Sequence, residues 1–215
     1  MSPAARQGDL FGGGDAGTGP AAGPAPPPLL RRQLLEWQRR LAAHQGPLFA
    51  AAAADGADAA DPAPRQGGLF AGETNGPGPA DPDRRAARLD PLSLQPQSLS
   101  FWRWPAAPQQ GAALYLVIDR PPEPSPPLLL YVGETARADR RWKGDHDCKG
   151  YLAAYTEALR RAELRPRLSI RFWSDVPAAT RPRRALEAAM IRRWQPPFNK
   201  ETRGRWATPF TSDPV

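Results

Sequence analysis

The sequence has little of what stabilises small secreted proteins or anchors membrane proteins. Its 215 residues include one cysteine, Cys148, so no disulfide framework can form and a reducing compartment is expected. Cys148 lies near His146, but two candidate ligands do not make a zinc site, and a free thiol is expected. No apolar run approaches the roughly 18 residues that cross a bilayer, and the N-terminus lacks the layout of a signal peptide. These absences predict a cytoplasmic protein with no membrane partner.

Aromatic residues are scarce in the first part of the chain. Residues 1–92 hold four aromatic residues and 14 of the 19 glycines, whereas residues 93–215 hold every tyrosine and six of the seven tryptophans. Apolar surface large enough to offset the loss of chain entropy is therefore concentrated in the second part. We predict a mostly disordered, Ala/Gly/Pro-rich arm over 1–92 and one compact domain over 93–215.

Charge divides the chain at nearly the same place. Residues 1–90 carry nine basic and ten acidic residues, a net charge of −1, and residues 91–215 carry 20 basic and 12 acidic residues, a net charge of +8. A basic folded part favours a polyanionic partner, and DNA is the partner we expect. A basic, soluble domain without such a partner is the alternative interpretation.

Within the arm, residues 29–44 have the pattern of one amphipathic helix. Leu30, Leu34, Trp37 and Leu41 recur near helical spacing, with arginines between them. Nothing near this segment in the sequence offers it a packing surface. We therefore expect the helix to dock either on the domain or on a partner.

The arm also contains a short repeat. The pattern Gln-Gly-x-Leu-Phe occurs at residues 7–11, 45–49 and 66–70. An exposed Leu-Phe pair is unfavourable in water unless a pocket receives it, so we expect a binding partner. The pattern resembles the peptide by which bacterial DNA polymerases and repair proteins bind the DNA polymerase sliding clamp, although a glycine follows the glutamine in all three copies. The resemblance implies that the clamp, or another protein with a Leu-Phe pocket, binds Gln7, Leu10, Phe11, Gln45, Leu48, Phe49, Gln66, Leu69 and Phe70.

The second part of the chain has the pattern of a small α/β (α+β) domain. Apolar runs at 112–119, 128–133 and 168–173 predict three strands, and the short Pro-rich connection between the first two requires an antiparallel hairpin. Helical periodicity predicts helices over 150–164 and 180–194, and a short helix fits near 136–142. We therefore expect a three-stranded antiparallel sheet flanked by helices.

Five polar residues in this domain suggest phosphodiester hydrolysis, which uses a metal ion, a base for water and a cation for the developing charge. They are Tyr115, Tyr131, Arg141, Glu187 and Asn199. Each also has a structural explanation. A strand tyrosine commonly packs with its hydroxyl satisfied, and Glu187 could face solvent and pair with Arg183 or Arg184.

Taken together, these residues resemble the GIY-YIG nuclease family, which includes homing endonucleases and the N-terminal domain of the excinuclease C subunit. Ala113-Leu114-Tyr115 and Tyr131-Val132-Gly133 match the two tripeptides, and Arg141 stands ten residues after Tyr131. The resemblance covers about residues 111–200 and implies the order β-β-α-α-β-α. Two departures are Ala113 in place of glycine and a longer gap between the tyrosines.

The resemblance also implies a mechanism with one Mg²⁺ or Mn²⁺ ion per site. Glu187 would hold the metal, Tyr115 would help to deprotonate water and Tyr131 would orient the water or phosphate. Arg141 would bind the scissile phosphate, His146 would assist it, and Asn199 would brace the site. A phenol with a pKa near 10 needs nearby cations to act as a base.

Basic residues around this core are candidate DNA contacts: Arg137, Arg140, Lys143, Lys149, Lys200, Arg203 and Arg205. The sequence thus predicts a DNA endonuclease recruited by the sliding clamp for repair, recombination or replication-linked processing, and located at the bacterial nucleoid. A non-catalytic DNA-binding protein or clamp adaptor that keeps the nuclease fold is the alternative.

Overall fold

Three apolar segments form one antiparallel sheet. They are β1 (Ala113–Asp119), β2 (Leu128–Thr135) and β3 (Leu168–Trp173), arranged in the order β2-β1-β3. All seven residues of β1 are buried, as expected of a central strand covered on both faces. The hairpin and all three predicted strands are therefore confirmed.

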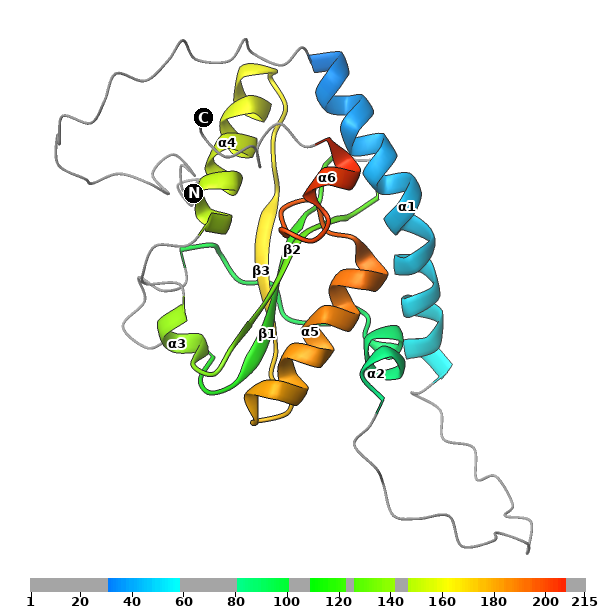
Figure 1. Cartoon of the computed structure of the whole chain (residues 1–215). Coiled ribbons are helices and arrows are strands. Elements are labelled where there is room, and N and C mark those ends of the chain that lie inside the picture. Colours follow the sequence, from blue (N-terminus) through cyan, green and yellow to red (C-terminus); the bar gives the residue numbers. More distant parts are fainter. Residues whose placement is uncertain (1–30, 59–80, 101–108, 123–125, 142–146, 208–215) are drawn as a thin grey trace, which may run out of the picture.

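The computed structural model describes residues 31–58, 81–100, 109–122, 126–141 and 147–207 (Figure 1). For residues 55–58, 140, 141 and 147 it describes the backbone alone. The disorder predicted for residues 1–28, and for most of the linker after the first helix, lies outside the described residues. None of the described helices is long and apolar enough to cross a membrane.

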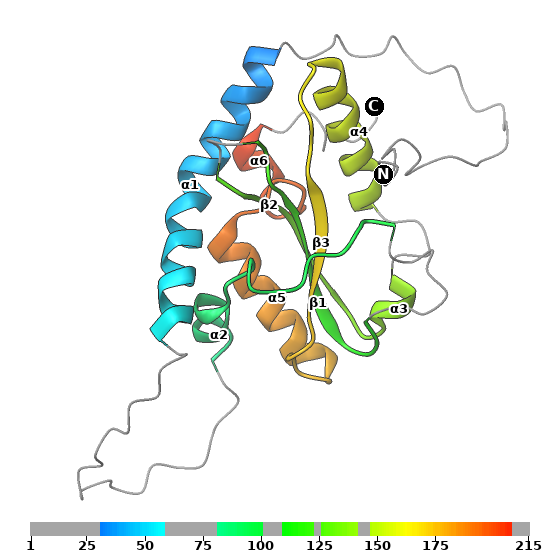
Figure 2. The same ribbon diagram turned by 180° about the vertical axis from the view of Figure 1, so that it is seen from behind.

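Helices cover both faces of the sheet (Figures 1 and 2). On one face, α4 (Asp147–Arg161) packs Leu152, Tyr155 and Leu159 into a cluster with Tyr115 and Val117. On the other face, α5 (Thr180–Trp194) buries Leu186, Met190 and Trp194 against the alternate residues of β1. With α3 (Ala138–Arg141) before α4, the elements follow the predicted order β-β-α-α-β-α.

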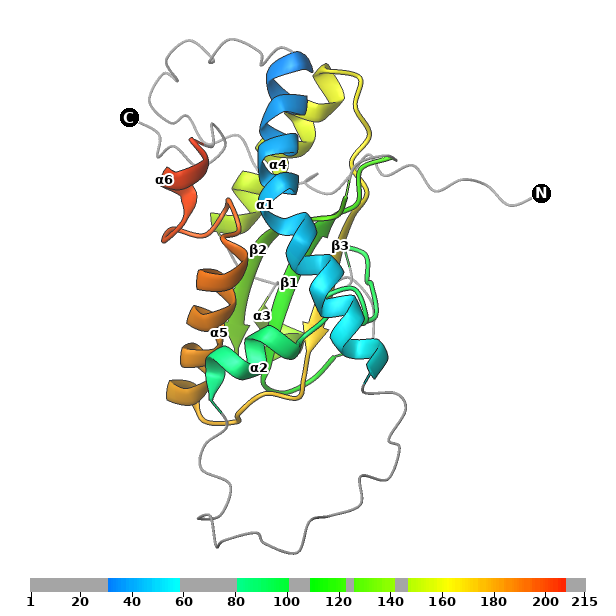
Figure 3. The ribbon, with the colours of Figure 1, turned by 90° about the vertical axis from the view of Figure 1, so that its right-hand side faces the viewer.

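The arm is more ordered than predicted. Helix α1 spans Arg31–Asp58, well beyond the predicted end at residue 44, although Pro47 lies inside it. Leu34 and Trp37 join the cluster on the α4 face, and Phe49 joins the cluster on the α5 face. Figure 3 shows α1 crossing in front of the strands. Burial against both clusters outweighs the local helix-breaking tendency of Gly46-Pro47, which is why the prediction failed.

Helix α2 (Pro82–Arg88) is a second departure, because this segment was predicted to belong to the linker. Asp81 caps it by accepting a hydrogen bond from the Asp83 N–H at 3.1 Å. Ala86 and Leu89 are buried in the cluster on the α5 face, and the Arg85 guanidinium lies 5.3 Å from the centre of the Trp173 ring. The folded domain therefore begins before residue 93.

Gln45 fastens α1 to the outer edge of the sheet. Its side-chain nitrogen donates to the carbonyl oxygens of Leu129 and Trp194, both at 2.9 Å, and its side-chain oxygen accepts from the Leu129 N–H at 2.7 Å. Leu129 lies on β2, an edge strand, so the Gln45 amide takes the place of a neighbouring strand at this residue. Phe49, one turn further on, lies 4.6 Å from Trp194 between ring centres.

The copy at residues 45–49 was expected to be exposed, and in this folded state it is not. Gln45 is fully buried and Phe49 is 5 % exposed, while Leu48 packs against the same cluster. The pattern was interpreted as an exposed peptide because its burial partners, Leu129 and Trp194, lie far away in the sequence.

We predict that Gln45→Ala lowers the free energy of unfolding by about 2–4 kcal/mol, because it leaves buried backbone groups of Leu129 without partners. Chemical denaturation monitored by circular dichroism measures this change. Arg40→Ala, at an exposed position of the same helix, serves as the control and should change the free energy by less than about 0.5 kcal/mol. Equal effects of the two substitutions would contradict the proposed role of Gln45.

Candidate active site

Tyr115 and Tyr131 lie side by side on neighbouring strands, as predicted. Their ring centres are 5.8 Å apart with an angle of 29° between the planes, and a side-chain hydrogen bond joins them. Tyr115 is fully buried, while Tyr131 is only partly buried. Of the two phenols, Tyr131 is therefore the more accessible to a substrate.

Gly133 makes this arrangement possible. It pairs with Tyr115 across the hairpin, and the Tyr115 ring lies directly over it. A Cβ atom at Gly133 would be 2.8 Å from Cε1 of Tyr115 and closer still to its hydroxyl. The tripeptide Tyr131-Val132-Gly133 thus ends in glycine because any other residue would displace the first tyrosine.

Glu187 lies on α5, and its side chain contacts β2 at the residue that follows Gly133. Its Oε1 accepts a hydrogen bond from the Glu134 N–H at 3.0 Å. Burial first, and then the negative charge of Glu134, raise the pKa of Glu187 to about 7. The sequence left open that Glu187 faces solvent and pairs with Arg183 or Arg184. Its carboxyl group is instead half-buried and hydrogen-bonded to β2, although the charge of Arg184 still acts on it and opposes the rise in its pKa.

The phenols and Glu187 belong to one electrostatic cluster. Burial is the main cause that raises the pKa of Tyr131 far above its ordinary value, and Tyr115, Cys148 and Glu187 all add to it. Cys148, on α4, is buried and forms no disulfide. Because the pKa of Tyr131 is raised, its hydroxyl stays protonated at neutral pH and can donate a hydrogen bond.

Glu134 is a site residue that the sequence pattern did not reveal. Its Oε2 accepts from the Nε of Arg183 at 2.8 Å, and its Oε1 lies 3.3 Å from the Nε of Arg184. Arg183 is 1 % exposed and also donates to the carbonyl oxygens of Pro177 and Ala178. The feature of the sequence that could have pointed to Glu134 is its position directly after Tyr131-Val132-Gly133.

Asn199 is hydrogen-bonded to β2 through both ends of its side-chain amide. Its side-chain oxygen accepts from the Val132 N–H at 3.0 Å, and its side-chain nitrogen donates to the Val132 carbonyl at 2.7 Å. The N–H of the preceding residue, Phe198, donates to the Leu130 carbonyl at 3.0 Å. Asn199 therefore holds the backbone of β2 immediately beside Tyr131.

The structure describes only some of the remaining predicted site residues. Arg141 ends α3, and of this residue and Arg140 the structure describes the backbone alone. His146 and Lys143 lie outside the described residues. Arg137, Lys200 and Arg205 are exposed, and Lys149 and Arg203 are half-buried. In Figures 1 and 3, α3 and α6 (Arg203–Trp206) lie apart from each other.

The residues around Glu187 fit a single hydrated Mg²⁺ or Mn²⁺ ion. Within the described residues, no group of three or more histidine, cysteine or acidic side chains could hold a metal ion. Mg²⁺, however, keeps several waters and binds through one or two carboxylates. The negative charges of Glu134 and Glu201 disfavour ionisation of Glu187, and a bound cation would reverse that effect.

Comparison of this chain with known protein families, with curated proteins and with solved structures gave no match. A function is therefore inferred from the geometry of these residues and from the resemblance of their order to the GIY-YIG pattern.

We predict that Glu187→Gln stabilises the protein at pH 8.5 and has little effect at pH 4. A carboxyl group whose pKa rises on folding contributes stability below its unfolded pKa of 4.5, and this contribution is lost as the pH rises through about 7. Allowing for solvent screening, the gain at pH 8.5 should be about 1–2 kcal/mol. Urea unfolding at both pH values measures it, and an equal gain at both would show that Glu187 has an ordinary pKa.

Proposed function

We propose that this chain is a metal-dependent DNA endonuclease of the GIY-YIG type, which hydrolyses phosphodiester bonds. The observation that carries the proposal is that Tyr115 and Tyr131 lie side by side on neighbouring strands while Glu187 of α5 is hydrogen-bonded to the same strand as Tyr131, and its charge acts on Tyr131. The bracing of β2 by Asn199 beside Tyr131 supports it. The excess of basic residues in this part of the chain supports a DNA substrate.

In this proposal, the half-buried Tyr131 orients the attacking water by a hydrogen bond. Tyr115 first loses its own proton to solvent, and the resulting phenolate accepts the proton that the water loses. Water forms a new bond to phosphorus, and the bond from phosphorus to the leaving oxygen breaks. Burial favours neutral phenols, so proton acceptance by Tyr115 needs positive charge, which Arg141 at the end of α3 would provide. The metal ion held by Glu187 would neutralise charge on the phosphate and leaving oxygens.

We predict that the purified protein cuts plasmid, branched or nicked DNA in the presence of Mg²⁺ or Mn²⁺. Glu187→Ala should reduce the rate by a factor on the order of a hundred to a thousand, since metal-based charge stabilisation contributes several kcal/mol. Glu36→Ala, at an exposed position of α1, is the matched control and should leave the rate unchanged. Mg²⁺ should also raise the thermal midpoint of the wild type but not that of Glu187→Ala.

Two outcomes reject the nuclease proposal. They are the absence of cleavage on every substrate and equal cleavage by wild type and Glu187→Ala. DNA binding without cleavage would favour the alternative, a non-catalytic DNA-binding protein or clamp adaptor that retains the fold.

We further propose that the sliding clamp recruits this enzyme to DNA, and hence to the bacterial nucleoid, for repair, recombination or replication-linked processing. Because the copy at 45–49 is buried in the domain, recruitment rests on the copies at 7–11 and 66–70, which lie outside the described residues. Two tethered peptides on one chain can engage a ring with several pockets by avidity.

Replacement of Leu10, Phe11, Leu69 and Phe70 by alanine should abolish co-purification of the clamp while leaving cleavage of free DNA intact. A chain changed in only one copy should retain part of the binding, because the second peptide still engages. Clamp binding that survives the fourfold replacement would show that these peptides are not the tether.

A further inference from the structure

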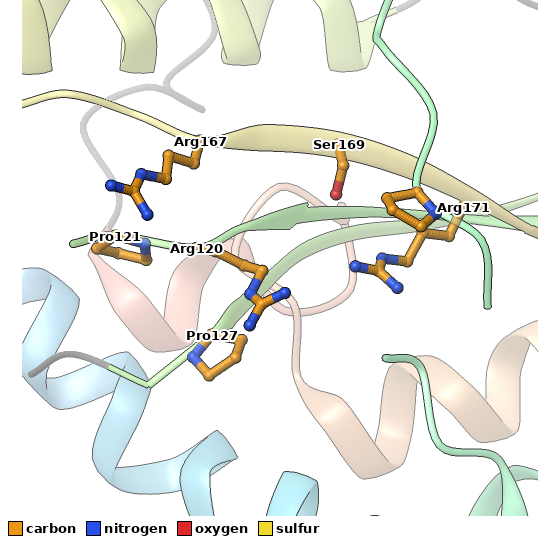
Figure 4. A pocket seen from close by; sticks show the side chains of 7 residues that line it. Arg120, Pro121, Pro127, Arg167, Ser169 and Arg171 are labelled. Carbon is orange, nitrogen blue, oxygen red and sulfur yellow. The ribbon is translucent and has the colours of Figure 1, made fainter. Parts of the chain in front are cut away.

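A cavity of about 490 Å³ lies on the sheet away from the two tyrosines (Figure 4). It is bounded by the segment that follows β1, the beginning of β3 and the prolines beside the hairpin turn. Its lining residues are Pro96, Arg120, Pro121, Pro127, Arg167, Ser169 and Arg171. The volume is within the range of pockets that hold small molecules.

The cavity lies toward the end of the strands where Arg120 follows β1 and Pro127 precedes β2, whereas Glu187 contacts Glu134 near the other end of β2. Phe172 pairs with Tyr115 across β1 and β3, and Arg171 pairs with Leu116. Because side chains alternate along a strand, Arg171 and Ser169 point to the face opposite that of Tyr115. A ligand in this cavity would therefore lie on the face opposite the two tyrosines, and it would be separated along the strands from the contact between Glu187 and Glu134.

Three arginines line the cavity, and no carboxylate is among its described lining residues. The nearest acidic residue in the sequence, Asp119, is directed elsewhere, because it accepts hydrogen bonds from Tyr155 and from the Arg167 N–H. Burial first, and then the charge of Arg120, lower the pKa of Arg171, and Asp90 opposes this change. Like charges gathered in this way favour the binding of an anion.

Two buried polar atoms at the cavity lack partners. The Nε of Arg171 and the Oγ of Ser169 are inaccessible to solvent and make no hydrogen bond within the described parts of the chain. Arg171 is 2 % exposed, and its Nη1 donates to the carbonyl oxygens of Leu92 and Leu94. The guanidinium is thus held through Nη1, and its Nε donor is still unused. Buried polar groups of this kind normally find a partner, and an anion with several acceptor oxygens would be one.

We propose that this cavity binds a phosphate group of a nucleotide, either free or within a DNA strand. Arg171 and Ser169 form the fixed inner part of the site, and the exposed Arg120 and Arg167 close over the phosphate from the outside. The proposal does not depend on the nuclease activity, because none of these residues belongs to the cluster around Tyr131 and Glu187.

The test uses the full chain carrying Glu187→Ala, in EDTA, so that neither metal binding nor cleavage contributes. Titration calorimetry with thymidine 5′-monophosphate and with a short oligothymidylate measures binding, and uncharged thymidine is the ligand control. We expect at least one of the two phosphate-bearing probes to bind. The variant Arg120→Gln/Arg167→Gln should bind that probe at least about tenfold more weakly, because two charge-assisted hydrogen bonds are lost. The control Arg165→Gln, an exposed arginine outside the cavity, should change the affinity less than about twofold.

Binding of the mononucleotide identifies a free nucleotide as the ligand, and binding of the oligonucleotide alone identifies a DNA strand. Both charge-reducing variants lie at exposed positions, and an unchanged thermal midpoint will confirm that they fold. The proposal is overturned if neither probe binds, if thymidine binds equally well, or if the double variant and Arg165→Gln bind alike.

Discussion

The structure depends on the way the outer edge of β2 is satisfied. An edge strand presents unpaired N–H and C=O groups that must be covered when they are buried. Within the part of the chain that the structure describes, no further strand does so. Gln45 pairs with Leu129, Phe198 with Leu130, Asn199 with Val132, and Glu187 with Glu134. Side chains from α1, from α5 and from the segment after α5, together with the backbone of Phe198, thus take the place of a neighbouring strand.

This edge also creates the candidate active site. Asn199 and Glu187 contact β2 on either side of Gly133, the residue over which the Tyr115 ring lies. The hydrogen bonds that complete the sheet therefore also fix the positions of Tyr131 and the carboxylate. Support of this kind is what a preorganised site requires, since small displacements of its groups reduce their effect. The same few contacts therefore stabilise the sheet and position the groups of the proposed active site.

The three strands, and the order of strands and helices along the chain, were predictable from the sequence, because an apolar run of strand length is a local signal. Residues 168–173 and 180–194 were predicted with the bounds that the structure has. The first helix was predicted too short, since Gly46-Pro47 is a local breaking signal that distant packing overrides. Helix α2 was missed because its seven residues are rich in Arg, Asp and Ala, and only Trp173 and the α5 face give it a place to pack.

The sequence by itself determined which polar residues could form the site, because their order and spacing are written along the chain. It also determined where the sheet and the helices after its strands would form, since apolar runs of the right length and periodicity occur there. Only the tertiary structure decided that one copy of Gln-Gly-x-Leu-Phe is internal, that Glu134 belongs to the site, and that Arg120, Arg167 and Arg171 line one cavity. The reason is physical: burial and hydrogen-bond partners depend on segments that meet only after folding, and local periodicity carries no record of them.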